Sequence, residues 1–157
     1  MLINFIIQPL SKSVLNGFTE LSKQALADRN AKWIRVDAHP GYPCRVSLKD
    51  AKIGERVLAV SFTHHNVSSP YRASGPIFIR EKAEMATLEM NEVPEILKDR
   101  LLSVRAYDSE HMMVGAEIVA GRDLPAGISR QFESGGVEYI HIHNANPGCF
   151  NCVAYRV

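Results

Sequence analysis

The sequence predicts one α+β domain over residues 1–157, with about seven short strands in a mixed or mainly antiparallel sheet and two helices. Its 157 residues, of which 46% are apolar, suit a single hydrophobic core. Short apolar runs with alternating polarity, bounded by Pro/Gly turns, are typical of strands. Strands and helices do not alternate regularly along the chain, which disfavours a parallel βαβ sheet.

In the N-terminal third, residues 2–8 form a β-branched run that ends at Pro9, which indicates a buried strand. Ser11 or Ser13 can then cap a helix that ends near residues 28–30. The apolar positions that define one face of this helix are Val14, Phe18, Leu21 and Ala25.

The middle of the chain predicts four strands joined by two polar connections. The connections are a rigid turn over residues 39–45 and a loop over residues 64–74. The predicted strands cover residues 31–38, 46–48, 56–63 and 77–80.

The C-terminal third predicts one helical turn, a second helix and four strands. Asp123 is a candidate cap for the helix, Gly135 and Gly136 end it, and its apolar face carries Leu124, Ile128 and Phe132. The other expected elements are a helical turn over 94–99 and strands over 101–107, 112–119, 137–143 and 149–157. In strand 137–143, Ile140 and Ile142 face one way and Tyr139, His141 and His143 the other.

Charge and cysteine usage limit the partners and the compartment. With 18 Lys+Arg against 17 Asp+Glu, the chain lacks the basic excess expected for non-specific binding to nucleic acid or to a membrane surface. It contains no apolar run of about 18 residues and no basic segment typical of a signal peptide. Three cysteines, an odd number, favour reduced thiols and hence a cytoplasmic protein.

Arginines in Pro/Gly turns are the main candidates for a binding site. Arg72 lies between Tyr71 and Ser74 in a turn, and Arg45 follows a Pro-Gly-Tyr-Pro-Cys turn. Guanidinium groups bind carboxylate or phosphate through paired, charge-assisted hydrogen bonds. Arg105 is either a second contact to the anion or a structural arginine.

His141 and His143 lie on one face of a strand, roughly 6–7 Å apart. An imidazole titrates near neutral pH, so either one is a candidate for proton transfer. The same pair with Cys149 and Cys152 is also compatible with a metal site, although residues three apart in a strand point to opposite faces. We therefore assign no metal ligand and leave the cofactor unknown.

Cys44 is a candidate nucleophile if a histidine activates it and Arg45 lowers its pKa. A lone cysteine beside proline is more often a small buried apolar group. The candidate bases are His39, His64, His65, His141 and His143.

Three blocks of the sequence resemble the uncharacterised bacterial family catalogued as domain of unknown function 1203. The blocks are Asp37-Ala38-His39-Pro40-Gly41-Tyr42-Pro43-Cys44-Arg45, Pro70-Tyr71-Arg72-Ala73-Ser74-Gly75-Pro76-Ile77-Phe78 and Tyr139-Ile140-His141-Ile142-His143-Asn144-Ala145-Asn146-Pro147-Gly148-Cys149. The resemblance also includes residues 100–108 and implies a small, stand-alone bacterial protein. It implies no activity, and Cys152 lies outside the pattern.

We expect the three blocks to meet at one pocket that binds a small anionic molecule, with or without catalysis. The alternatives are a metalloprotein that uses His141, His143 and Cys149, and a protein-interaction module without catalysis. The sequence leaves the oligomeric state open. The proposed catalytic residues are His141, His143 and Cys44, and the proposed ligand-binding residues are Arg45, Tyr71, Arg72, Ser74, Arg105, Asn144 and Cys149.

Overall fold

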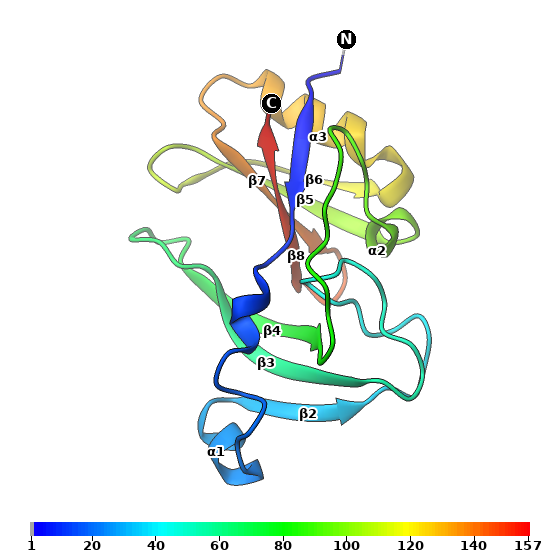
Figure 1. Ribbon diagram of the computed structural model, residues 1–157. Helices are drawn as coiled ribbons and strands as arrows, with labels where there is room; N and C mark the ends of the chain where they lie inside the picture. Colours follow the sequence, from blue (N-terminus) through cyan, green and yellow to red (C-terminus); the bar gives the residue numbers. More distant parts are fainter. Residues whose placement is uncertain (1) are drawn as a thin grey trace.

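The computed structural model describes residues 2–157, and its eight strands form two antiparallel sheets (Figure 1). The strands are β1 (Phe5–Gln8), β2 (Ala31–Arg35), β3 (Arg56–His65), β4 (Ala73–Arg80), β5 (Leu101–Tyr107), β6 (Met113–Ala120), β7 (Tyr139–Asn144) and β8 (Phe150–Arg156). The helices are α1 (Lys23–Asp28), α2 (Glu95–Lys98) and α3 (Leu124–Glu133), with 3-10 turns η1 (Lys12–Leu15) and η2 (Gly121–Asp123). The predicted α+β class is confirmed, but the strands divide between two sheets.

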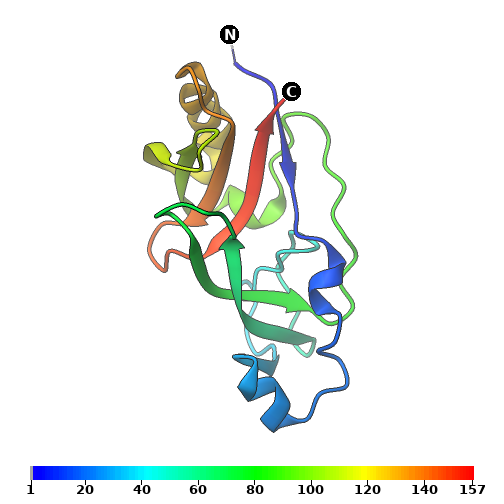
Figure 2. The same ribbon diagram turned by 90° about the vertical axis from the view of Figure 1, so that its left-hand side faces the viewer.

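The five-stranded sheet has the order β1-β8-β7-β5-β6, and α3 covers one of its faces (Figure 2). The helix buries the predicted face of Leu124, Ile128 and Phe132, because these side chains recur at helical spacing. They pack in one core with Ile140 and Ile142 of β7. The opposite face of β7 is therefore left to Tyr139, His141 and His143, as the alternation predicts.

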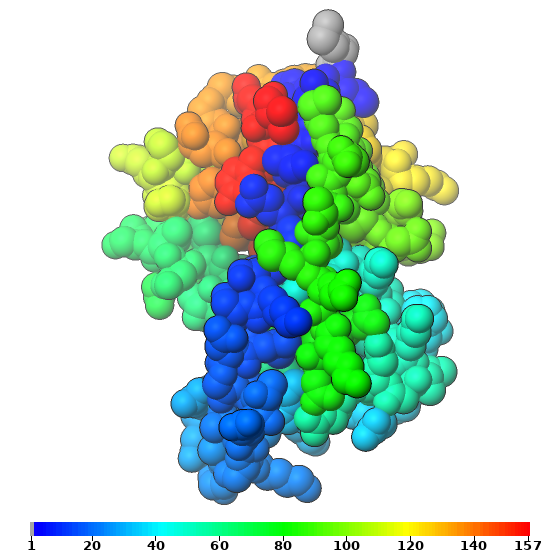
Figure 3. Space-filling view, viewed as in Figure 1, coloured from blue at the N-terminus to red at the C-terminus, as the bar shows by residue number. Residues whose placement is uncertain are grey.

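The three-stranded sheet has the order β2-β3-β4 and a core of its own. Leu58 of β3 and Ile79 of β4 pack there with Leu15, Leu26 and Cys44. The two sheets meet where β4 approaches β8. Residues 81–94, in green in Figure 3, then run past the N-terminal segment to the five-stranded sheet.

The single helix expected after residue 11 is wrong. Ser11 caps only η1, which ends at Leu15: Asn16 is already non-helical, and Gly17 follows with a φ of +84°. Ser22 then caps α1 by accepting a hydrogen bond from the N–H of Ala25. Asn16 and the left-handed Gly17 thus separate one helical segment from the next.

Three further expectations need correction. Residues 46–48 form a turn closed by the Leu48 N–H and the Cys44 carbonyl, instead of a strand. The N-cap residue of α3 is Asp123, but its side chain makes no capping hydrogen bond. β3 continues through His65, so both His64 and His65 belong to a strand rather than to the predicted loop.

The helices of residues 2–157 are too short or too polar for a membrane span.

Candidate functional site

Arg45 is the largest fully buried side chain that carries a charge. It is 2% exposed, and its backbone N–H donates to the carbonyl of Phe78 in β4. Its Nε donates to the carbonyl of Phe150 at 2.8 Å, and its Nη1 donates to the carbonyl of Pro43 at 2.5 Å. The side chain therefore ties the Pro/Gly turn of residues 39–45 to the start of β8.

Burial, with a smaller contribution from nearby Arg100, lowers the pKa of Arg45 to about 10, so the guanidinium remains charged at neutral pH. The ion pairs found within residues 2–157 do not include Arg45. Its partners are neutral carbonyl groups. A buried cation without a counter-ion is costly, because neutral dipoles replace only part of its hydration.

Arg45 borders a cavity of about 400 Å³ between the two sheets. The other lining residues are Gly41, Pro43, Phe78, Arg100, Leu101, Asn144, Asn146, Pro147 and Cys149. Arg100 is neutralised by Asp50, whose carboxylate lies 2.9 Å from its Nη2. Of the two arginines that line this cavity, Arg45 is therefore the one without a carboxylate partner in the described chain.

Two predicted ligand-binding residues of the third sequence block line the same cavity. Asn144 is 9% exposed, and its Oδ1 accepts a hydrogen bond from Asn151 at 2.9 Å. Its Nδ2 therefore remains a donor. Cys149 is half-buried and lines the cavity together with Arg45.

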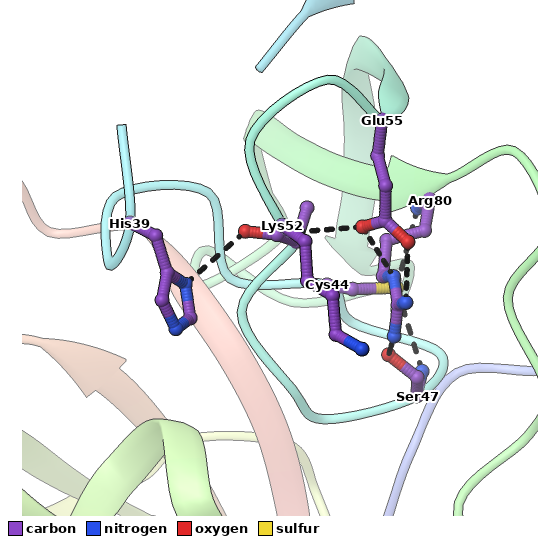
Figure 4. A network of polar contacts seen from close by, with 7 residues as sticks. His39, Cys44, Ser47, Lys52, Glu55 and Arg80 are labelled. Atoms are coloured by element: carbon purple, nitrogen blue, oxygen red, sulfur yellow. Dashed lines mark hydrogen bonds and ion pairs between the residues drawn. The ribbon is translucent and has the colours of Figure 1, made fainter. Parts of the chain in front are cut away.

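Cys44 lies in the core, away from solvent. It is 0% exposed, and its sulfur accepts hydrogen bonds from the N–H groups of Ser47 and Arg80 at 3.4 and 3.3 Å (Figure 4). His39, the histidine drawn beside it, interacts instead with the Ala51 carbonyl. A substrate does not reach a fully buried sulfur, so the structure argues against Cys44 as a nucleophile.

The predicted histidines belong to a larger group, the imidazole cluster, which consists of His64, His65, His141 and His143. His64 and His65 come from β3, and the other two come from β7 in the other sheet. The ring of His64 lies 5.1 Å from that of His143 and 6.2 Å from that of His141, while His65 lies 4.9 Å from His141, measured between centroids. The cluster therefore forms part of the contact between the two sheets.

Hydrogen bonds fix the protonated nitrogen of two of these rings. A carbonyl only accepts, so His143 donates from Nδ1 to Gly148 at 2.8 Å and keeps a lone pair on Nε2. His65 likewise donates from Nδ1 to the carbonyl of Tyr71. The buried nitrogens that find no partner among residues 2–157 are His64 Nδ1, His141 Nδ1 and His143 Nε2.

A chain of hydrogen bonds extends from His65 toward the loop between β5 and β6. Because His65 Nδ1 is the donor, its Nε2 accepts from the hydroxyl of Tyr139 at 2.6 Å. That hydroxyl in turn accepts from Nδ1 of His111 at 2.8 Å. Burial raises the pKa of Tyr139 to about 12, which keeps the hydroxyl protonated.

Burial lowers the pKa of His141 to about 2 and that of His143 to about 3. For His141, neighbouring His65 and His143 act in the same direction as burial and contribute to this shift. For His143, the hydrogen bond to Gly148 opposes the shift, and Arg105 reinforces it. Both rings are therefore neutral at physiological pH.

The alternative metal set of His141, His143 and Cys149 is not brought together in the described residues. Cys149 lines the Arg45 cavity, whereas the two imidazoles pack against β3. Over residues 2–157, no three or more His, Cys, Asp or Glu side chains form a group that could hold a metal ion.

The remaining predicted residues lie outside the Arg45 cavity. Arg72 is exposed and hydrogen-bonds to Asn66, and the hydroxyl of Ser74 contacts Thr63 at 2.9 Å. The ring of Tyr71 packs near Tyr107. Arg105 is paired with His141 across β5 and β7, and its Nε donates to Ser103.

The three blocks therefore meet only in part. The first and third share the Arg45 cavity, to which the second contributes Phe78 at its end. Sequence reasoning named His64 and His65 only as bases for Cys44 and missed their packing against His141 and His143. The local sequence contains no signal for this packing, because residues 63–66 are all polar and the pairing of β3 with β4 shifts its register between Phe62 and His65.

Comparison with known proteins gives a family and no activity. No curated protein and no solved structure matches the chain. Residues 41–156 match the family described as "Protein of unknown function (DUF1203)", which agrees with the resemblance of the three sequence blocks. Because this match covers most of the 157 residues, the chain belongs to that family.

Proposed function

We propose that the protein binds a small monocarboxylate in the cavity beside Arg45. The observation that supports this proposal is a guanidinium that is 2% exposed and has only carbonyl groups as partners within the described chain. An anion in the cavity would supply the missing counter-charge. A charge-assisted hydrogen bond contributes about 1.5–3 kcal/mol, more than a neutral one.

The walls of the cavity favour a carboxylate over a multiply charged phosphate. Arg100 is already paired with Asp50, so Arg45 offers the one unmatched positive charge among the lining residues. Apolar walls would cover the body of the ligand, since Phe78 and Leu101 line the same space. A volume of about 400 Å³ fits a small molecule.

Asn144 and Asn146 are the groups that would orient the carboxylate. Asn144 keeps its Nδ2 as a donor because its Oδ1 is bonded to Asn151. His141 and His143 do not line the cavity, so the proposal concerns binding and assigns no catalytic step.

Isothermal titration calorimetry with aliphatic monocarboxylates of increasing length, and with inorganic phosphate, tests the proposal. Arg45→Lys keeps the positive charge but loses the paired donors, so we expect about a ten- to hundredfold loss of carboxylate affinity. The matched control is Arg72→Ala, which removes an exposed guanidinium outside the cavity and leaves the affinity unchanged.

Asn146→Ala provides a second variant at an exposed position that does not threaten folding, and we expect it to weaken binding. The proposal fails if no carboxylate binds the wild type. It also fails if Arg72→Ala weakens binding as much as Arg45→Lys does, because the ligand would then lie elsewhere.

We also infer a reducing compartment, the cytoplasm, because all three cysteines are free. Cys149 is half-buried and has no disulfide partner. Fractionation of cells that express the tagged protein checks this inference, and recovery from an extracytoplasmic fraction would contradict it.

A further inference from the structure

Edge strands expose unpaired backbone groups, and this fold protects two of its four edges by covering them. On β1, the Phe5 carbonyl accepts from the Asn91 N–H, and the Phe5 N–H donates to the Asn91 side chain. On β4, Arg45 N–H donates to the Phe78 carbonyl, and Pro76 removes one further donor. These contacts block the addition of another strand.

The other two edges differ in charge. β2 carries Lys32 and Arg35 within its five residues, and such charges discourage edge-to-edge pairing. β6 has eight residues without Lys, Arg or Pro. No backbone hydrogen bond from elsewhere in residues 2–157 reaches it. Its one irregularity, at Val114, lies near its start and leaves the rest of the strand regular.

The outer face of β6 is apolar as well as open. Val114 is 52% exposed and Ile118 is 65% exposed, with the exposed Ala116 between them. Glu117 points to the opposite face, where Arg130 of α3 holds its carboxylate at 2.9 Å. An uncovered edge of this length, whose one charged residue is turned toward α3 and paired there, is a template for strand pairing.

We propose that β6 pairs antiparallel with β6 of a second copy of this chain, with Ala116 on the two-fold axis. In this register, Val114 lies opposite Ile118 of the second copy, so each dimer contains two apolar cross-strand pairs. Glu117 lies opposite Gly115. The two five-stranded sheets would become one continuous sheet, as a symmetric two-fold interface permits.

Charge disfavours the neighbouring symmetric register that is centred on Glu117. If the axis passed through Glu117, two carboxylates would lie directly opposite each other, which is destabilising. With Ala116 on the axis, a small outward-facing side chain lies where the two β6 strands face the same residue of each other. Arg105, beside Ala116 on β5, is kept about 14 Å from its counterpart by three strand spacings.

Light scattering coupled to size-exclusion chromatography tests the proposal on the full chain. We expect the wild type to elute as a dimer, and Ile118→Lys as a monomer, since it puts a charge into each apolar pair. The matched control is Ile53→Lys, in the loop before β3, because Ile53 is 68% exposed and lies on no strand. This control stays dimeric.

Circular dichroism verifies that both variants are folded. A wild type that is monomeric at every concentration, or an Ile118→Lys variant that remains dimeric, overturns the proposal.

Oxidative cross-linking tests the register. In an antiparallel pair, opposite Cα atoms lie about 4.5–5.5 Å apart, within the span of a disulfide. Ala116→Cys therefore gives a covalent dimer on a non-reducing gel. Glu117→Cys gives none, because its thiol faces α3 and lies opposite Gly115 of the second copy. Cross-linking of Glu117→Cys in place of Ala116→Cys contradicts the proposed axis, and wild-type protein under the same oxidant controls for the native thiols.

Discussion

Arg45 and His141 are both titratable side chains taken out of water, and they respond in opposite ways. Arg45 stays charged, because a pKa of about 10 is still well above neutral pH. His141 loses its proton, because burial and its neighbours lower its pKa to about 2. The charged Arg45 therefore supports the proposed anion site, whereas His141 belongs to a neutral, hydrogen-bonding contact between two sheets.

The imidazole cluster should make stability depend on pH. His141 and His143 have folded pKa values of about 2 and 3, below the ordinary value of 6.5. Below pH 6.5 the unfolded chain takes up protons that the folded chain excludes. The free energy of unfolding therefore falls as pH decreases, by up to about 1.4 kcal/mol per pH unit for each histidine.

Urea denaturation between about pH 8 and pH 5 measures this slope. His141→Gln should reduce the slope by the contribution of one proton, and Ile53→Gln, at an exposed position without a titratable side chain, should leave it unchanged. Equal slopes for the wild type and His141→Gln would show that His141 is not held neutral.

At the scale of secondary-structure elements, η2 packs so closely against α2 that the contact requires a glycine. A Cβ built on Gly121 would lie 1.7 Å from the carbonyl oxygen of Leu97, so only glycine fits there. This contact sets α2 against the end of β6, since the Gly121 N–H also donates to the Arg100 carbonyl.

Gly121→Ala should lower the free energy of unfolding by about 3 kcal/mol, because backbone must move to admit a methyl group. Gly75→Ala is the control, since a Cβ there meets nothing within 4 Å, and its change should stay within about 0.5 kcal/mol. Thermal and urea denaturation measure both. A similar, small effect of the two substitutions would mean that η2 shifts freely.

For the whole molecule, the cavity between the sheets brings together segments far apart in the sequence. Asp50 follows the Pro/Gly turn, Arg100 precedes β5, and Arg45 bonds to Phe150 over 105 positions. The charge state of the cavity is therefore set by an ion pair that joins the two parts of the fold.

Asp50→Asn should change both stability and specificity. It removes the partner of a partly buried Arg100, which should cost about 1–3 kcal/mol of unfolding free energy. It also leaves two unmatched guanidinium groups at the cavity, so affinity for inorganic phosphate should rise relative to that for a monocarboxylate. Calorimetry with both anions measures the ratio, and an unchanged ratio would argue against anion binding at this cavity.

The local pattern predicted the parts of the fold that depend on near neighbours. Helical spacing identified the buried face of α3, and alternation separated Ile140 and Ile142 from His141 and His143. It failed between residues 11 and 28, where Gly17 takes a left-handed conformation that apolar spacing does not report. For the site, it singled out Arg45, Asn144 and Cys149, which do share a cavity, and also Arg72, which does not line it.

By itself, the sequence determined the α+β class, the family and the arginine-bearing turns, because these follow from local spacing and from residue identity. Only the tertiary structure decided that the strands form two sheets. It also decided that the two histidines of β3 pack against His141 and His143 of β7. Likewise, it placed Arg45 beside a cavity and gave its guanidinium no carboxylate partner within residues 2–157. Burial, and with it the pKa of each group, depends on residues brought together from distant positions, which local patterns do not encode.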